Sequence, residues 1–196
     1  MIRIAINPDL NLVIVIIGAC QLYEEETNEL IKPFIEKGLI YLVEPAHSNI
    51  QKLYEKFGKN QNIIIIKAAI SSRDGKGFLH LSRGILSHTL KEPRENKKEQ
   101  YIGEEKVSLY TWKTLVENFE IKIVDVCQID AEGSEEDILE SMTNCKILPR
   151  VLLLSHYHDK HFKNLKSKKE LEEKMKELGY SIVSEGDNEL RGEMKE

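Results

Sequence analysis

Residues Ile121–Glu135 have the sequence IKIVDVCQIDAEGSE and carry the strongest fold signal in the chain. The run IVDVCQI, which begins at Ile123, is mostly apolar and β-branched. It predicts a strand buried on both faces, as in a parallel sheet. The run stops at Asp130, Glu132 and Gly133, just before an amphipathic helix. Because ligands of open α/β sheets bind beyond the carboxyl ends of the strands, this acidic turn is expected to form the floor of a site.

Ser134 and Asp137 offer a purely structural interpretation of the same turn. Their Ser-x-x-Asp spacing resembles a capping box, and acidic residues suit a helix N-terminus. This interpretation leaves Asp130 and Glu132 unexplained, because both precede the cap. The sequence alone leaves the capping and the functional interpretations open.

Length, charge and cysteine content narrow the class of protein. A chain of 196 residues predicts one domain spanning 1–196, and a net charge of −5 argues against a nucleic-acid partner. The three cysteines are far apart and lack zinc-ligand spacing, which predicts reduced thiols in a cytoplasmic protein. No apolar run reaches the length of a membrane span, so no membrane partner is expected. Residues 12–20 (LVIVIIGAC) resemble a short signal-peptide core but lack the basic leader that export requires.

The first third of the chain alternates between two apolar patterns. Continuous apolar runs at 12–17, 39–43 and 62–66 predict buried strands, and amphipathic helices are expected between them. The first of these helices is expected to open at the acids Glu24–Glu26, and the Ser48-x-x-Gln51 spacing is expected to cap the second. This alternation implies right-handed crossovers and a parallel sheet.

The rest of the chain does not continue this alternation of strands and helices. The expected elements are a turn at 71–77, a short hairpin strand at 78–81, a mobile charged loop or lid at 91–106, a strand at 107–112, a brief helix at 114–119, a strand at 151–154, a helix capped by Ser167-x-x-Glu170, and a terminal hairpin of 180–183 with 189–194.

The predicted strand ends collect groups that suit a nucleoside cofactor. Gly18-Ala19 follows the first strand, and such small residues let a ligand approach the backbone. Glu44 ends the second strand, where an acid can accept hydrogen bonds from both ribose hydroxyls. Asp130 and Glu132 follow the central strand. Taken together in chain order, these residues predict a nucleoside-cofactor site.

At this point the residues resemble the FkbM-type methyltransferases, which have the class I S-adenosylmethionine (SAM) fold. The resembling segments keep the family's order along most of the chain: Val15–Ala19 (VIIGA), Tyr41–Pro45 (YLVEP), Ala68–Ser71 (AAIS) before Asp74-Gly75, Thr111, Gln128–Gly133 (QIDAEG) and His156. The QIDAEG and LVEP segments are the more specific of these.

The resemblance implies a Rossmann-like α/β fold with a mostly parallel central sheet and helices on both faces, here followed by the C-terminal antiparallel hairpin. It implies SAM as the cofactor and O-methylation of a small-molecule or glycan hydroxyl, with the oligomeric state left open. The expected cofactor-binding residues are Gly18, Ala19, Gln21, Glu44, Pro45 and Ala69, and the expected catalytic residues are Asp130, Glu132 and His156.

The cofactor loop departs from the family pattern. Such proteins usually continue Ile-Gly-Ala with Asn-Asp-Gly or Asn-Ile-Gly, whereas this chain has Cys20-Gln21-Leu22. A side chain at Leu22 is expected to crowd the methionine end of SAM and weaken binding, unless Gln21 or the backbone rebuilds the turn. Ser155 also replaces the Glu that often precedes the equivalent of His156.

The expected mechanism is an in-line methyl transfer in which Asp130, Glu132 or His156 accepts the hydroxyl proton. A divalent-metal site made by Asp130 with His156, His158 and His161 is a second interpretation of the same strand ends. Two other function classes stay open: a weak or inactive methyltransferase-like module that binds a nucleoside or a partner, and an NAD-binding domain. The latter requires a G-x-G-x-x-G motif after the first strand, which the sequence lacks.

Overall fold

The computed structural model describes residues 11–20, 30–84, 87–156, 162, 165–184 and 189–194. Its elements in chain order are β1 (Val13–Ile17), η1 (Lys32–Phe34), β2 (Leu39–Val43), α2 (His47–Phe57), β3 (Ile63–Ile66), β4 (Ala69–Ile70), β5 (Gly75–Ser82), η2 (Glu95–Gln100), β6 (Tyr101–Tyr110), α3 (Trp112–Asn118), β7 (Val126–Ile129), α4 (Glu135–Met142), β8 (Val151–Ser155), α5 (Lys168–Glu177), β9 (Tyr180–Ser184) and β10 (Glu189–Met194). The acids Glu24–Glu26, which were expected to open the first helix, lie outside the described residues.

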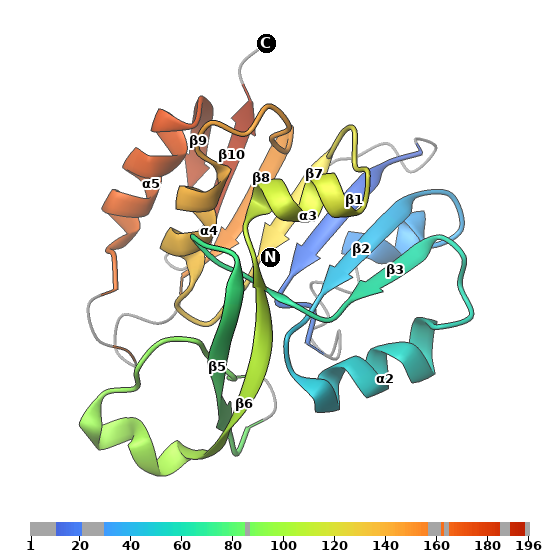
Figure 1. Ribbon diagram of the computed structural model, residues 1–196. Coiled ribbons are helices and arrows are strands. Elements are labelled where there is room, and N and C mark those ends of the chain that lie inside the picture. The colour runs from blue at the N-terminus through green and yellow to red at the C-terminus, as the bar shows by residue number, and fades with distance from the viewer. Residues whose placement is uncertain are drawn as a thin grey trace.

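A seven-stranded sheet forms the centre of the molecule, in the order β3-β2-β1-β7-β8-β10-β9 (Figure 1). In this sheet each pair of neighbours among β3, β2, β1, β7 and β8 is parallel, and β10 is antiparallel to both of its neighbours. The predicted parallel sheet and C-terminal hairpin are therefore confirmed. In the register of the central pair, Ile17 of β1 lies opposite Ile129 of β7, so the two strands end at the same level. This alignment sets the turns that follow β1 and β7 beside each other.

Helices cover both faces of the sheet because alternate strand residues point to opposite sides. On one face, Val15 and Ile17 pack in a core with Trp112 of α3, Leu139 of α4 and Met175 of α5. On the other face, the intervening residues of β1 pack with the buried side chains of η1 and α2. Strands buried on both faces explain why the apolar runs in the sequence are continuous rather than alternating.

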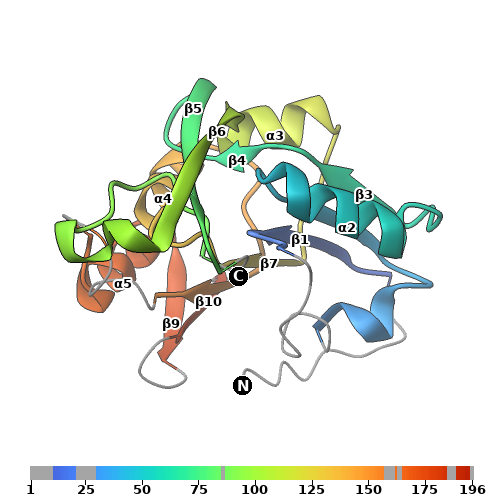
Figure 2. The ribbon, with the colours of Figure 1, turned by 90° about the horizontal axis from the view of Figure 1, so that it is seen from below.

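The segment 91–106, which was expected to be a mobile loop or lid, is ordered structure instead. It contains η2 and the first half of β6, which pairs with β5 in a second sheet of order β4-β6-β5. Figures 1 and 2 show β5 and β6 standing away from the main sheet. The segment before η2 is fixed by a β-bridge from Pro93 to Phe162 and by a 2.8 Å bond from the Arg94 guanidinium to the carbonyl of Phe162. The prediction of an irregular loop is therefore wrong, because the segment forms a 3-10 helix and a paired strand.

Two of the expected helix caps can be compared with the structure. Ser167 caps α5 as expected, since its hydroxyl accepts from the Glu170 N–H while the Glu170 carboxylate accepts from the Ser167 N–H. Ser48 does not cap α2, because the helix begins one residue earlier, at His47, and Ala46 occupies the N-cap position. The Ala46 N–H instead donates to the Glu44 carboxylate at 2.8 Å, which fixes the chain just before the helix.

Two of the family-like residues in the middle of the chain hold the second sheet in place. The carboxylate of Asp74, in the turn before β5, accepts from the N–H of Thr111 at 2.7 Å and from the hydroxyl of Thr114 at 2.8 Å. Thr111 also caps α3. The role of Asp74 and Thr111 is therefore to join the start of the β5–β6 pair to α3.

Within the described ranges, no helix is both long and apolar enough to cross a membrane.

Candidate active site

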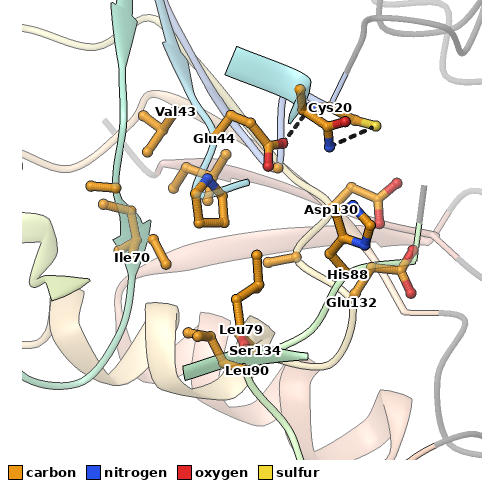
Figure 3. Close-up of a pocket in the computed structure, with 17 residues that line it drawn as sticks. Cys20, Val43, Glu44, Ile70, Leu79, His88, Leu90, Asp130, Glu132 and Ser134 are labelled. Atoms are coloured by element: carbon orange, nitrogen blue, oxygen red, sulfur yellow. Dashed lines mark hydrogen bonds between the residues drawn. The ribbon is translucent and has the colours of Figure 1, made fainter. Parts of the chain in front are cut away.

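An open pocket lies where the strand ends of the main sheet meet the second sheet, with about 510 Å³ of empty volume (Figure 3). The described residues that line it are Ile17, Gly18, Cys20, Val43, Glu44, Pro45, Asn49, Ala68, Ala69, Ile70, Leu79, His88, Leu90, Asp130, Ala131, Glu132 and Ser134. The strand ends predicted to form a site therefore do meet around one cavity.

The turn after β1 is built on Gly18. The N–H groups of Gly18 and Ala19 both donate to the carbonyl of Val43, at 3.0 and 3.1 Å, which joins the ends of β1 and β2. Gly18 has φ +79°, and a β-carbon there would lie 1.8 Å from the carbonyl oxygen of Asp130. Only glycine fits this close approach of the β1 turn to the acidic turn after β7.

Cys20 continues the turn in an unusual backbone conformation. Its φ of +38° lies in the left-handed region that side chains other than Asn and Asp rarely adopt. The Cys20 N–H donates to Glu44 at 2.7 Å, and its sulfur accepts from the Asn49 amide at 3.5 Å. Gln21 and Leu22 lie outside the described residues, so the expectations attached to them stay predictions.

Glu44 is the most deeply buried acid of the pocket, with 4% of its surface exposed. Burial raises the pKa of its carboxyl group to about 7, the charge of Glu105 adds to the rise, and hydrogen bonds from Ala46, Cys20 and Asn49 oppose it. A buried carboxyl group that titrates near neutrality is typical of functional sites rather than of solvated strand ends. Its position at the end of β2 is the one predicted for ribose recognition.

The acidic turn after β7 is held by two sets of hydrogen bonds. The carbonyl of Glu132 accepts from the hydroxyl of Thr89 at 2.6 Å. One oxygen of the buried Glu135 carboxylate accepts from the N–H groups on either side of Glu132, those of Ala131 at 3.1 Å and Gly133 at 3.2 Å. These bonds keep Glu132 at φ +49°, a strained conformation for a residue with a β-carbon. Strain of this kind is concentrated at functional sites.

The predicted capping box of Ser134 and Asp137 is wrong, although acidic residues do occupy the first turn of α4 as expected. Ser134 stands at the N-cap of α4, but its side chain makes no capping hydrogen bond. Asp137, the other half of the expected capping box, binds the ammonium group of Lys91 at 2.7 Å. The Glu135 carboxylate instead satisfies the N–H groups of the turn that precedes the helix.

Residues 17–182 match the sequence profile of the methyltransferase FkbM domain, which covers well over half of the chain. The chain belongs to the FkbM methyltransferase family. No curated protein sequence matches this FkbM-family chain. The family suggested by the IIGA, LVEP and QIDAEG segments is therefore confirmed.

Solved structures similar to this FkbM-family chain share its fold at low sequence identity. A methyltransferase FkbM from Methylobacillus flagellatus KT has a TM-score of 0.53 and 16% identity over 94% of this chain and 45% of its own. Aeropyrum pernix fibrillarin, solved with natively bound SAM, has a TM-score of 0.53 and 13% identity over 97% of this chain and 70% of its own. A precorrin-6y C5,15-methyltransferase from Geobacter metallireducens GS-15 has a TM-score of 0.50 and 12% identity over 94% and 80%. The class I methyltransferase fold is therefore confirmed, and the chain spans less than half the length of the M. flagellatus protein.

Most of the site residues expected for an FkbM-family protein lie at the pocket. Gly18, Glu44, Pro45, Ala69, Asp130 and Glu132 all line it. Ala19 is buried and is not a lining residue. His156 follows β8, outside the set of lining residues, so its catalytic role stays a prediction. His158 and His161 lie beyond the described residues, and the described part of the chain contains no cluster of three or more metal-binding side chains.

His88 is a pocket residue that the sequence pattern did not reveal. It follows β5 in an irregular segment, so no strand-end or helical period marks it. Its Nδ1 accepts from the backbone N–H of Ser82 at 3.0 Å, and burial lowers its pKa, opposed by the charge of Glu105. The neutral ring therefore carries its proton on Nε2 and acts as a hydrogen-bond donor. Figure 3 shows His88 on the same side of the pocket as Asp130 and Glu132.

Proposed function

We propose that this FkbM-family chain is a SAM-dependent methyltransferase that acts on a hydroxyl oxygen of a small molecule or glycan. The observation that supports the proposal most is the arrangement of three strand ends around one pocket. Gly18 after β1, buried Glu44 at the end of β2, and Asp130 with Glu132 after β7 all line it. Membership of the FkbM methyltransferase family supports the same reaction class.

The residues present fit an adenosyl cofactor. Gly18 lines the pocket and has no side chain, so a ligand can approach its backbone closely. Glu44 supplies two carboxylate oxygens for the vicinal hydroxyls of a ribose, and the aliphatic side chains of Ile70 and Leu79 supply an apolar wall for a base. When bound, SAM would supply an electrophilic methyl group, and loss of that group would convert its sulfonium sulfur to a neutral thioether.

The chain itself must accept the proton of the acceptor hydroxyl. Asp130 and Glu132 are the carboxylates positioned for this task at the pocket floor. Burial and the charge of Glu132 raise the pKa of Tyr101 to about 12, so this phenol stays protonated and does not compete as a base. His88, neutral and with its Nε2–H as donor, suits a hydrogen bond to the oxygen of the acceptor.

A second candidate function is a nucleoside-binding or partner-binding module with weak or no catalysis. The strained turn at Cys20 favours it, because the family's usual Asn at this position tolerates a positive φ better than cysteine does. Both candidates share the nucleoside pocket and differ in turnover.

We expect S-adenosylhomocysteine (SAH) to bind the protein, with an affinity that rises as the pH rises through about 7. Because the pKa of Glu44 is raised to about 7, its carboxyl group is protonated below that pH and cannot accept two ribose hydroxyl bonds as well as an ionised group can. Glu44→Gln should weaken binding by about 1–3 kcal/mol at pH 8 and remove most of the pH dependence. Calorimetric titrations from pH 5.5 to 8.5 measure both effects.

Glu117→Gln, at an exposed position on α3, is the matched control and should leave the affinity and its pH profile unchanged.

The raised pKa of Glu44 also has a consequence for folding. Protonated Glu44 is the form that folding favours, so its contribution to stability is full below the unfolded pKa and is lost as the pH rises through about 7. No SAH binding by the natural protein at pH 8 would overturn the proposed function.

A further inference from the structure

Ser134 has a side chain that neither the fold nor the proposed chemistry uses. It lines the pocket at the start of α4, with 3% of its surface exposed. In the part of the chain that the structure describes, its Oγ has no hydrogen-bond partner. A buried hydroxyl without a partner destabilises a fold, and most buried polar groups do have one. The position therefore calls for a reason other than folding.

Helix capping does not supply that reason. The N–H groups at the turn before α4 are bound by the Glu135 carboxylate, and Ser134 makes no capping bond. Ser167 shows what a capping serine does in the same molecule, because its hydroxyl accepts from the Glu170 N–H at the start of α5. The two serines occupy the same helix position, yet only Ser167 is used by its helix.

The surroundings of Ser134 indicate the chemistry of a missing partner. Figure 3 shows Ser134 on the same side of the pocket as Leu79 and Leu90, across from Glu44. Leu79 belongs to an apolar cluster of the second sheet, against which Leu90 packs. A ligand that fills this end needs apolar faces for the leucines and a heteroatom at its edge for the hydroxyl. A flat nitrogen heterocycle has both.

We propose that the Ser134 hydroxyl hydrogen-bonds the purine base of the adenosyl cofactor; this inference rests on the proposed function. With the ribose at Glu44, the base extends away from that carboxylate toward the apolar wall. A hydroxyl group can donate to a ring nitrogen or accept from the exocyclic amino group of adenine. Leu90 is only partly buried and lines the pocket, so its side chain offers an apolar surface to the edge of the ring.

The test compares Ser134→Ala, Ser167→Ala and the natural protein by calorimetry with SAH and with adenosine, and by thermal melting. Ser134→Ala should weaken the binding of both ligands by about five- to tenfold, which is the effect of losing one hydrogen bond. Its melting temperature without ligand should stay the same or rise, because the substitution removes an unpartnered buried hydroxyl. Ser167→Ala should show the opposite pattern, with a lower melting temperature and unchanged affinities.

Several results would overturn the inference. A folded Ser134→Ala protein that binds SAH within twofold of the natural protein would do so, as would a loss of SAH affinity without a matching loss for adenosine. A melting temperature that falls as it does in Ser167→Ala would show a structural role instead. Ser134→Cys, similar in shape but a poor hydrogen-bonding group, repeats the test if the alanine variant does not fold. If the natural protein binds no SAH the proposed function fails as well, whereas normal binding with no effect of Ser134→Ala defeats this inference alone.

Discussion

Gly18→Ala is expected to lower the free energy of unfolding by at least about 3 kcal/mol. The added β-carbon would lie 1.8 Å from the carbonyl oxygen of Asp130, in a residue already at φ +79°. Backbone atoms on both sides of this contact belong to turns fixed by hydrogen bonds between strands, so neither can move away at low cost. Urea unfolding followed by circular dichroism measures the change.

Substitutions at two other glycines separate the cost of the steric clash from the cost of the backbone conformation in Gly18→Ala. Gly75 has φ +137° with no atom near its expected β-carbon, so Gly75→Ala should show only the cost of the backbone conformation. Gly103 has neither a positive φ nor a neighbour, and Gly103→Ala should change stability little. If Gly18→Ala costs no more than Gly75→Ala, the close approach of the β1 and β7 turns is not a constraint on the fold.

Asp130→Asn and Glu132→Gln are expected to lower the rate of methyl transfer by about 10²- to 10⁴-fold for whichever residue serves as the base. Both substitutions keep the shape of the side chain and remove its ability to take a proton. SAH affinity should change far less than kcat, because the carboxylate acts on the acceptor proton rather than on the bound cofactor. The measurement is SAH release with an acceptor found by screening small-molecule and glycan hydroxyls.

The two substitutions also report on the turn itself. Glu132→Gln leaves the backbone carbonyl that Thr89 binds, so the turn should keep its conformation. Circular dichroism and melting temperatures close to those of the natural protein are the required control. Loss of folding in both variants would assign the acids a structural role, and full activity in both would remove them from the chemistry.

Much of the fold could be predicted because its strands are buried on both faces. The runs at 12–17, 39–43 and 62–66 became β1, β2 and β3 within a residue of the expected ends. The β5–β6 pair was harder to predict because it stands away from the main sheet. Residues such as Glu104 and Lys106 are exposed there, and they mimic the composition of a loop. The order of the strands in the sheet depends on long-range packing that no local pattern records.

Some residues of the candidate site could likewise be predicted from the sequence, and others could not. Glu44, Asp130 and Glu132 could be predicted because strand ends in a parallel sheet converge on one edge. His88 and Thr89 could not, because a β-bridge to His80 and a hydrogen bond to Glu132 bring their irregular segment to the pocket. Ser134 was visible in the sequence but suggested a capping role, and only the structure, in which its buried hydroxyl makes no capping bond, distinguishes it from Ser167.

The place of β10 in the main sheet constrains how the protein is made. β10 follows β9 along the chain but lies between β8 and β9, pairing with both. During synthesis, β8 therefore emerges from the ribosome with an exposed edge that stays unpaired until Glu189–Met194 has been translated. Strands β3, β2, β1 and β7, which form the other side of the sheet, are all translated before β10. The strands that carry Gly18, Glu44 and Asp130 can thus assemble first, and the last-made strand closes the sheet.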